Sequence, residues 1–240
     1  MLSIIIPTLN EEKHLVKLLK SIEKQDFKDY EIIIADAGSK DKTLDVAKKY
    51  KCKIVKGGSP AEGRNNGAKV AKGERLLFLD ADVTLPKKVF GKILKEFKKR
   101  KLKIATFFLA PPEKKNKKLS SFFFTFFYNI PIFLLEKALP HAAMGILIEK
   151  KLFNKLNGYN EEITLAEDHD LARRAGKLGK YGILKSTKLH VSDRRFEKEG
   201  WFKTYSKYLL CEGHMIFIGP VKKDIFKYNF NHLKNIDKKK

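Results

Sequence analysis

The chain of 240 residues carries 51 lysines and arginines against 28 aspartates and glutamates, which gives a formal net charge of +23 at pH 7. A hydrophobic content of 43% is enough for one large core, so the composition excludes a disordered chain and favours one domain with appendages. The charge implies an anionic partner, and nucleotide phosphates, an anionic membrane face and nucleic acid all meet that requirement. Abundant lysine is also compatible with thermal adaptation.

The two cysteines, Cys52 and Cys211, are far apart and have neither the spacing of a metal site nor that of a redox motif. We therefore expect no disulfide framework and a reducing, cytosolic compartment. Residues 2–7 have the pattern of a strand and lack the basic start of a cleavable leader, so we expect no export signal.

The first hundred residues alternate short β-branched runs with amphipathic stretches. The runs predict strands at residues 4–6, 32–35, 53–55 and 76–79. The amphipathic stretches predict helices at residues 43–50, 61–71 and 87–100, and an earlier helix with Asn10 as its N-cap. This βαβ rhythm predicts an α/β fold.

Residues 119–135 carry no charge, and a segment of this length is borderline for a membrane span. Asn129 and Pro131 lie inside it and basic residues precede it, so we expect a helix in the membrane interface rather than across the membrane; a buried hairpin is the alternative. We further predict a strand at 144–148, helices at 150–156 and 167–178, and an aromatic, lysine-rich region at 201–230 with one apolar side.

Asp80-Ala81-Asp82 directly follows the apolar run at residues 76–79. A buried strand that ends in two carboxylates places them at the sheet edge where open α/β folds bind ligands. Hard carboxylate oxygens at that edge suit Mg²⁺ or Mn²⁺ beside phosphates. The alternative is a solvated turn.

Two earlier strand ends are also polar. The first strand ends in Pro7-Thr8-Leu9-Asn10-Glu11, which opens a helix whose free amides can meet a nucleotide or can simply be capped. The second ends in Asp36-Ala37-Gly38-Ser39, where the carboxylate can accept the imide N–H of a pyrimidine or can form an Asx turn.

Arg64 lies in Gly63-Arg64-Asn65-Asn66-Gly67, about one turn into a helix, where it can reach a phosphate or a base or can remain on the surface. Gly67 allows this helix to approach its neighbours closely. The second motif, Glu167-Asp168-His169-Asp170, opens a helix. One of its carboxylates can act as a general base, and ordinary dipole pairing with an Asp170–Arg174 contact is the alternative.

In this order, the motifs at residues 7–11, 36–39, 63–65, 80–82 and 167–168 resemble those of family 2 glycosyltransferases of the GT-A type, over about residues 1–200. The resemblance implies an α/β fold of the GT-A class, a Rossmann-like mixed sheet flanked by helices, with amphipathic membrane-associating helices. It implies a catalytic domain at 1–200, in which 119–139 is an interfacial or core segment, and a basic, aromatic helical extension at 201–240.

The resemblance also implies residue roles. Asp168 is the expected catalytic base, oriented by Glu167. The expected donor-binding residues are Pro7, Thr8, Asn10, Glu11, Asp36, Gly38, Ser39, Arg64, Asp80, Ala81 and Asp82. Asp82, Asp80 and His190 are the expected ligands of Mn²⁺ or Mg²⁺, although a lone histidine is often structural. Arg194 and Arg195 stand where some relatives carry Q-x-x-R-W and would bind acceptor or phosphate; the departure from that motif makes a processive synthase doubtful.

The expected activity is inverting, metal-dependent transfer of a hexose from a UDP- or GDP-sugar to a lipid-linked or membrane-proximal acceptor, at the cytosolic face of an anionic membrane. The alternatives are a sugar-1-phosphate nucleotidyltransferase, a basic nucleic-acid-binding protein and a non-catalytic family member. The scattered lysines match no nucleic-acid motif. The sequence leaves the donor base, the sugar and the acceptor open.

Overall fold

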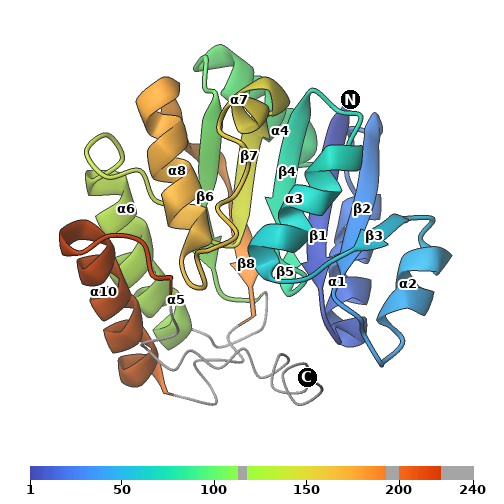
Figure 1. Cartoon of the computed structure of the whole chain (residues 1–240), viewed down its shortest axis with the longest axis horizontal. Helices are drawn as coiled ribbons and strands as arrows, with labels where there is room; N and C mark the ends of the chain where they lie inside the picture. Colours follow the sequence, from blue (N-terminus) through green and yellow to red (C-terminus); the bar gives the residue numbers. More distant parts are fainter. Residues whose placement is uncertain (113–117, 193–199, 223–240) are drawn as a thin grey trace.

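The computed structural model describes residues 1–112, 118–192 and 200–222, which form a sheet with helices packed against both faces (Figure 1). The strands are β1 (Leu2–Thr8), β2 (Tyr30–Asp36), β3 (Lys53–Lys56), β4 (Arg75–Leu79), β5 (Val83–Thr84), β6 (Ile104–Ala110), β7 (Gly145–Glu149) and β8 (Tyr181–Val191). The helices are α1 (Glu12–Glu23), α2 (Thr43–Lys49), α3 (Pro60–Val70), α4 (Phe90–Lys99), α5 (Lys118–Phe124), the π-helix η1 (Thr125–Asn129), α6 (Ile130–Leu134), α7 (Lys150–Lys155), α8 (Glu167–Leu178) and α10 (Trp201–Phe217).

In the described ranges the strand order is β3-β2-β1-β4-β7-β6-β8-β5. The first four strands are mutually parallel, whereas β7 runs antiparallel to both β4 and β6. Strand β5 pairs antiparallel with β8, which sets Thr84 opposite His190. Because parallel strands end at one edge, Thr8, Asp36 and the Asp80 turn come together there. The sheet is therefore mixed, as the resemblance implies.

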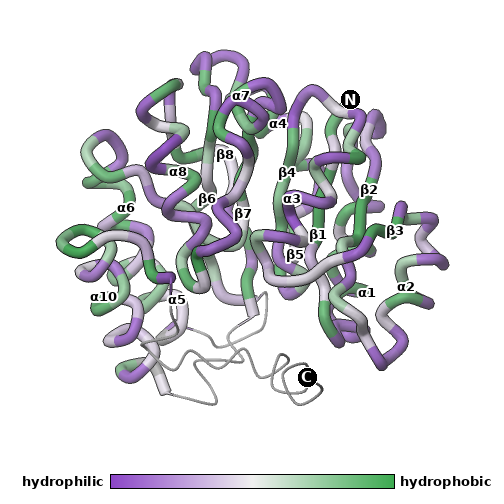
Figure 2. The backbone as a smooth tube through the Cα atoms, viewed as in Figure 1, coloured by the Kyte–Doolittle hydropathy of each residue, from purple (hydrophilic) through white to green (hydrophobic). Residues whose placement is uncertain are grey.

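The core lies on both faces of the sheet. Along β1, Ile4 and Ile6 belong to the cluster that packs against α1 and α4, while Ile5 belongs to the cluster that packs against α3 and α8. Successive side chains of a strand point to opposite faces, so a strand buried on both sides is apolar throughout. Figure 2 shows this as continuous hydrophobic colour along the central strands.

The predicted elements of the first hundred residues are present, with ends that differ by at most three residues. The predicted N-cap is wrong: Glu11 is the N-cap of α1, and Asn10 adopts a left-handed conformation with φ of 55°. The Asn10 side chain instead accepts a hydrogen bond from the backbone N–H of Lys40 at 2.8 Å. Strand β6 was not predicted, although six of its seven residues are apolar.

Residues 118–134 are helical rather than a hairpin, and they are buried on one side only. Phe124 and Ile132 are buried, whereas Phe122 and Phe126 are more than half exposed. The amide of Asn129 bonds both backbone groups of Leu109 in β6, at 2.9 and 2.8 Å, so it ties this helical segment to the sheet. Among the described helices, none is long and apolar enough to cross a membrane.

Helix α10 confirms the helical part of the region predicted at 201–230, whose residues from 223 onwards lie outside the described ranges. Its buried Cys211 and Met215 pack with Leu165 and Val221 in a small separate cluster. The aromatic ring of Tyr205 lies 5.3 Å from that of Phe127. Helix α10 thus lies beside α5 and η1, at one end of the sheet (Figure 1).

Gly67 confirms the close approach that we predicted for α3, because a Cβ atom there would lie 2.4 Å from Cγ2 of the buried Ile5. We predict that Gly67→Ala lowers the free energy of unfolding by about 1–3 kcal/mol, since the rigid Ile5 has no space to move.

Gly213→Ala in α10 is the matched control, because a Cβ atom there meets nothing within 4 Å. The free energy of unfolding of this control should rise by up to about 1 kcal/mol, because alanine has the higher helix propensity. Denaturant unfolding measures both effects, and equal shifts in the two variants would contradict the packing argument.

Candidate active site

The guanidinium of Arg64 lies at the centre of the candidate site, and the residue is only 3% exposed. Its Nη1 donates to Glu167 Oε1 at 2.5 Å and its Nη2 donates to Asp80 Oδ1 at 2.7 Å. Asp168 Oδ2 lies 3.7 Å from the same Nη2. The surface alternative for Arg64 is therefore wrong, and three acidic residues from two distant motifs converge on one cation.

Local structure explains why Arg64 reaches this position. Helix α3 begins at Pro60 with Ser59 as N-cap, whose hydroxyl accepts the backbone N–H of Glu62 at 3.2 Å. Arg64 then lies one turn into the helix, on the face that packs against β1 and β2. Its partners come from two places: Asp80 directly follows the end of β4, and Glu167 and Asp168 lie in the first turn of α8.

The charges in this cluster perturb one another. Burial disfavours the Arg64 charge, but Asp168, Tyr159, Asp80 and Glu167 together hold the pKa of Arg64 well above its usual value. For Asp168, burial outweighs the attraction of Arg64 and, with Glu167 and Asp80 nearby, raises the pKa to about 7. A carboxylate that titrates near neutral pH is suited to accept a proton from a substrate.

Tyr159 completes the surroundings of Asp168 and was not predicted. Its hydroxyl donates to Asp168 Oδ1 at 3.0 Å, and its ring lies 5.2 Å from the Arg64 guanidinium carbon. Burial, together with the negative charge of Asp168, raises the pKa of Tyr159 well above its usual value, so the phenol remains a donor. The side chain of Asn65 holds the Tyr159 backbone with two hydrogen bonds. Its Oδ1 accepts from the Tyr159 N–H at 2.8 Å, and its Nδ2 donates to the Tyr159 carbonyl oxygen at 2.9 Å.

Asp80 keeps 32% of its side chain exposed while one of its oxygens binds Arg64. The backbone carbonyl of Asp82 accepts the N–H of Ser192 at 3.2 Å, next to the β5–β8 pairing that positions His190. His190 Nδ1 lies 2.8 Å from the carbonyl oxygen of Pro111, the kind of contact that orients a metal-binding histidine. Within the described residues these three side chains do not gather into a three-ligand cluster, so a bound diphosphate would have to supply further oxygens.

Asp36 organises the loop after β2, which is the arrangement of the Asx-turn alternative. Its Oδ1 accepts the N–H groups of Gly38 and Ser39, and its Oδ2 accepts the hydroxyls of Thr8 and Ser39. These four bonds use the acceptor positions of the carboxylate. A nucleobase that bound Asp36 would therefore have to displace one of the hydroxyl bonds.

The turn after β1 is joined to the same loop. The N–H of Glu11 donates to the Thr43 hydroxyl at 2.9 Å, and the N–H of Glu12 donates to Asp41 Oδ2 at 3.1 Å. Thr8 and Glu11 are buried, and Pro7 is partly exposed beside them. The start of α1 is thus capped by protein groups, and the two loops form one rigid unit at the sheet edge.

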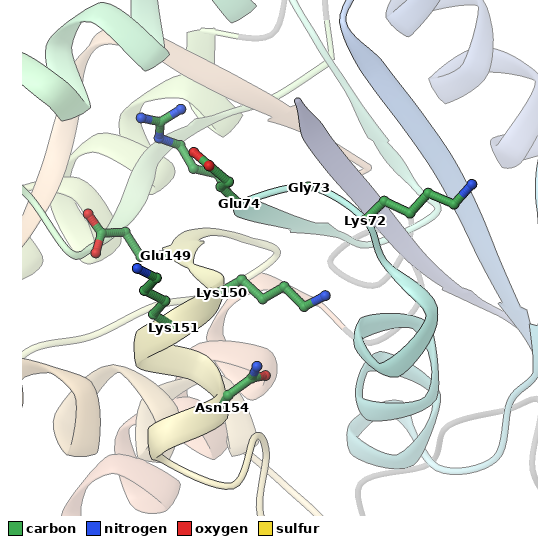
Figure 3. Close-up of a pocket in the computed structure, with 8 residues that line it drawn as sticks. Lys72, Gly73, Glu74, Glu149, Lys150, Lys151 and Asn154 are labelled. Atoms are coloured by element: carbon green, nitrogen blue, oxygen red, sulfur yellow. The ribbon is translucent and has the colours of Figure 1, made fainter.

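One pocket borders these residues, and another lies away from them. One of about 490 Å³ is lined by Asn65, Tyr159 and Arg174 among others, and so borders the Arg64 cluster. The other, of about 380 Å³ and shown in Figure 3, is lined by lysines around Gly73 and Glu149. Since β4 begins and β7 ends there, this basic pocket lies at the opposite sheet edge. Arg194 and Arg195 lie outside the described residues.

The helix of the Glu167-Asp168 motif also contains the Asp170–Arg174 contact of the alternative interpretation, because Arg174 Nε donates to Asp170 Oδ2 at 2.7 Å. This contact leaves Glu167 and Asp168 for Arg64. In this helix Asp170 and Arg174 therefore form a structural pair, whereas Glu167 and Asp168 belong to the candidate site.

Comparisons with known proteins agree on one family. The family model described as Glycosyl transferase family 2 matches residues 3–156. The chain is 39% identical over 90 residues to the poly(ribitol-phosphate) beta-N-acetylglucosaminyltransferase TarS of Staphylococcus aureus, which covers 33% of this chain and 16% of that protein. It is 41% identical over 90 residues to a GalNAc(5)-diNAcBac-PP-undecaprenol beta-1,3-glucosyltransferase of Campylobacter jejuni, which covers 34% of this chain and 29% of the relative. The chain thus matches less than a third of the length of either relative.

Solved structures share the fold. S. aureus TarS 1-349 in complex with UDP-GlcNAc is similar with a TM-score of 0.66 and 19% identity, over 90% of this chain and 72% of that one. The mannosyltransferase PcManGT from Pyrobaculum calidifontis, in complex with GDP-Man and Mn²⁺, is similar with a TM-score of 0.69 and 18% identity, over 90% of this chain and 64% of that one. The GT-A fold expected from the sequence is therefore confirmed.

The raised pKa of Asp168 has a consequence for stability. A carboxyl group whose pKa is about 7 in the folded state and 3.8 ordinarily favours folding most when protonated, so its contribution is lost as pH rises from about 4 to 7. Asp168→Asn cannot ionise. We predict that the stability of Asp168→Asn relative to the parent protein rises across this range by up to about 4 kcal/mol.

Urea unfolding at pH 4, 5.5 and 7 measures this difference. A difference that stays constant with pH, or that falls as pH rises, would contradict the burial of an ionisable Asp168 beside Glu167 and Asp80.

Proposed function

The chain belongs to glycosyl transferase family 2, and on that premise we propose that it transfers one hexose from a nucleoside diphosphate donor to an acceptor hydroxyl, with inversion at the anomeric carbon. The observation that carries the proposal is Asp168. It has a pKa of about 7, it is held by Tyr159, and it lies beside the arginine that also binds Asp80 of the D-x-D motif.

The proposed reaction is a single displacement. An acceptor hydroxyl gives its proton to Asp168 and attacks the anomeric carbon, while the bond from that carbon to the diphosphate oxygen breaks on the opposite side. Since Oδ1 of Asp168 is bonded to Tyr159, Oδ2 is the oxygen that would take the proton. Glu167 orients the site through its bond to Arg64, because that bond fixes the guanidinium beside Asp168.

We propose that Asp82, Asp80 and His190 hold Mn²⁺ or Mg²⁺ against the donor diphosphate. Two carboxylates at a strand end fit such an ion, and a solved structure of the same fold contains Mn²⁺. The bound ion would offset the negative charge that develops on the departing diphosphate. Asp80 would bind the ion through Oδ2, since its Oδ1 already accepts a hydrogen bond from Arg64.

The nucleoside would bind over the joined loops after β1 and β2. Asp36 contacts the base, and the surrounding residues Pro7, Thr8, Asn10, Glu11, Gly38 and Ser39, with Ala81 in the D-x-D turn, shape the donor site. UDP- and GDP-sugars are the proposed donors, because structures of this fold bind UDP-GlcNAc or GDP-Man. Their diphosphates carry the negative charge that the basic chain favours.

We propose that the acceptor is lipid-linked or lies at the cytosolic face of a membrane, where the protein associates peripherally. Large apolar side chains are exposed on α5, η1 and α6, and again on the neighbouring α10. They include Phe122, Phe126, Phe127, Phe133, Leu134, Phe202, Leu209 and Phe217. Apolar side chains inserted at the interface, together with a net charge of +23, favour an anionic bilayer.

We also propose that the chain divides into a catalytic domain at residues 1–200 and a basic extension from residue 201, where helix α10 begins. In this proposal Arg194 and Arg195 bind acceptor or phosphate. The family match and the intact acidic residues do not favour the nucleotidyltransferase, nucleic-acid-binding or non-catalytic alternatives.

Asp168→Asn tests the catalytic proposal. We predict that kcat falls by about 10²–10⁴-fold, because the proton acceptor is lost, while the donor still raises the melting temperature in the presence of Mn²⁺. Turnover is measured by mass spectrometry with UDP- and GDP-hexoses and extracted polyprenyl phosphates or lipid-linked glycans as acceptors.

Asp170→Asn is the matched control, since Asp170 lies in the same helical turn but pairs with Arg174. It should keep more than about a tenth of the parent turnover, because the lost ion pair is with Arg174 and the proposed proton acceptor stays in place. Full turnover by Asp168→Asn would refute the proposed base.

Membrane association has its own test. The triple variant Phe122→Ser, Phe126→Ser and Phe217→Ser removes exposed side chains only, whereas Phe124 is buried and is left intact. We predict that it loses most co-sedimentation with anionic vesicles at ~0.15 M salt, where charge attraction is screened.

Ile54→Ser is the control, because Ile54 is exposed on β3, away from these helices. It should bind vesicles as the parent does. Equal binding by the triple variant, or no binding by the parent, would refute the proposed membrane surface.

A further inference from the structure

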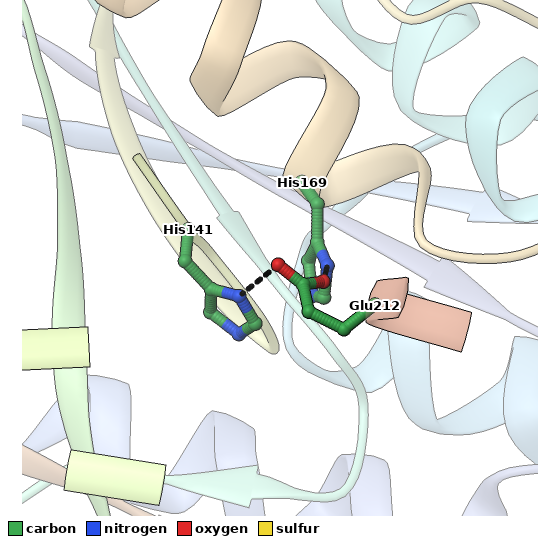
Figure 4. Close-up of side chains that lie close together, drawn as sticks. All are labelled: His141, His169 and Glu212. Carbon is green, nitrogen blue, oxygen red and sulfur yellow. Dashed lines mark hydrogen bonds and ion pairs between the residues drawn. The ribbon is translucent and has the colours of Figure 1, made fainter. Parts of the chain in front are cut away.

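A second cluster of chemically active side chains lies outside the candidate active site. His141 precedes β7, His169 follows Asp168 in α8, and Glu212 lies on α10 (Figure 4). Their nearest ligand atoms all lie within 4.8 Å of one another. His169 Nδ1 is 2.9 Å from Glu212 Oε2, and His141 Nδ1 is 3.8 Å from Glu212 Oε1.

The surroundings make this a defined site rather than a chance meeting of surface groups. The side chains of both histidines are 16% exposed and that of Glu212 is 20% exposed. The imidazole rings lie 3.8 Å apart between centroids. Arg173 Nη2 donates to Glu212 Oε1 at 2.5 Å, so this carboxylate already has one cationic partner.

The charge balance favours neutral histidines. Two imidazolium rings and Arg173 around one carboxylate would repel one another strongly. In agreement, burial and the neighbouring His141 lower the pKa of His169 to about 4. The hydrogen bond from His169 and the nearby His141 outweigh burial and lower the pKa of Glu212. Two neutral imidazoles and one ionised carboxylate form a ligand set that proteins use for zinc.

We propose that His141, His169 and Glu212 bind one Zn²⁺, which joins helix α10 to the catalytic helix α8. Nitrogen and oxygen ligands at zinc distances of about 2.0–2.1 Å lie about 3.3 Å apart in a tetrahedral site. The 2.9 Å separation of His169 Nδ1 from Glu212 Oε2 is close to this value, and His141 Nδ1 lies 3.8 Å from the other oxygen of the same carboxylate. The fourth position would hold water or another small ligand.

Arg173 is compatible with the ion. It binds Oε1 of Glu212, so Oε2 is the oxygen that would face the zinc, and the arginine would orient the carboxylate from outside the coordination shell. Zinc bound at Nδ1 of His169 would leave the single ring proton on Nε2, so the neutral imidazole and the ionised carboxylate bind the ion without net release of a proton. Imidazole ligands favour zinc over the Mg²⁺ that suits the D-x-D motif.

The ion would add to the packing that holds helix α10. Its buried Cys211 and Met215 form a small cluster with Leu165 and Val221, while Tyr205 and Tyr208 pack against the main core. His169 is the residue after Asp168, so the same ion would fix the first turn of α8 at the active site.

The test is zinc titration of the full chain after treatment with EDTA, in competition with a chromophoric chelator. We expect one Zn²⁺ per chain, and we expect His141→Ala and Glu212→Gln each to weaken affinity by about 100-fold or more. Co²⁺ should give the intense visible absorption of a four-coordinate site in the parent and not in these variants.

Two controls separate this site from the proposed donor metal. His190→Ala and His214→Ala should bind zinc as the parent does; His214 lies on the same helix, where its ring contacts the carbonyl oxygen of Gly219. Circular dichroism reports folding, and if Glu212→Gln does not fold, His141→Ala decides. The proposal would be overturned by a Kd for zinc weaker than about 10 μM in the parent protein. It would also be overturned by unchanged zinc affinity in His141→Ala, or by loss of zinc binding in His190→Ala.

Discussion

The buried guanidinium of Arg64 is the interaction on which the site depends. Burying one charge costs several kcal/mol, and only well-placed partners offset that cost. Glu167 and Asp80 provide direct bonds, and Asp168 lies within 4 Å. Because the partners come from the end of β4 and the start of α8, the cation holds together elements that are remote in sequence. The D-x-D turn and the Glu167-Asp168 turn, which we propose as the donor and catalytic sides of the site, are thereby fixed relative to one another.

A second constraint operates at the loops after β1 and β2. Asp36 accepts four hydrogen bonds from these loops, and Asn10, Thr43 and Asp41 connect them further. A loop fixed in this way loses little conformational freedom when a nucleotide binds. The sheet edge therefore combines two hydrogen-bonded loops, which we propose as the donor platform, with an acidic cluster whose ionisation depends on burial. In our proposal, the exposed apolar helices beside it bring a membrane-bound acceptor to the same edge.

The sequence predicted the parts of the fold that follow from local pattern. Strands β1, β2 and β4 are continuous apolar runs because both faces of the sheet are covered, and α8 begins and ends at the predicted residues. Strand β6 has the same kind of run and was overlooked. The π-helix at Thr125–Asn129 has no comparable signal, and Asn10 was misjudged because its side chain bonds a loop thirty residues away.

The sequence indicates which residues of the site carry charge, but not which of them come into contact. Acidic residues at strand and helix ends are visible in the sequence, and so is the glycine that allows α3 to pack on β1. The burial of Arg64 is not visible, because it results from partners 16 and 103 residues away. The contact of Tyr159 with Asp168, and the convergence of His141, His169 and Glu212, likewise depend on tertiary packing alone.

The most direct measurement of the central claim is a double-mutant cycle on unfolding free energy with Arg64→Met, Glu167→Gln and the double variant. If the buried Arg64–Glu167 contact assembles the site, Arg64→Met costs about 3–5 kcal/mol and the coupling energy exceeds about 1.5 kcal/mol. Effects of the two substitutions that add within about 0.5 kcal/mol would contradict the account.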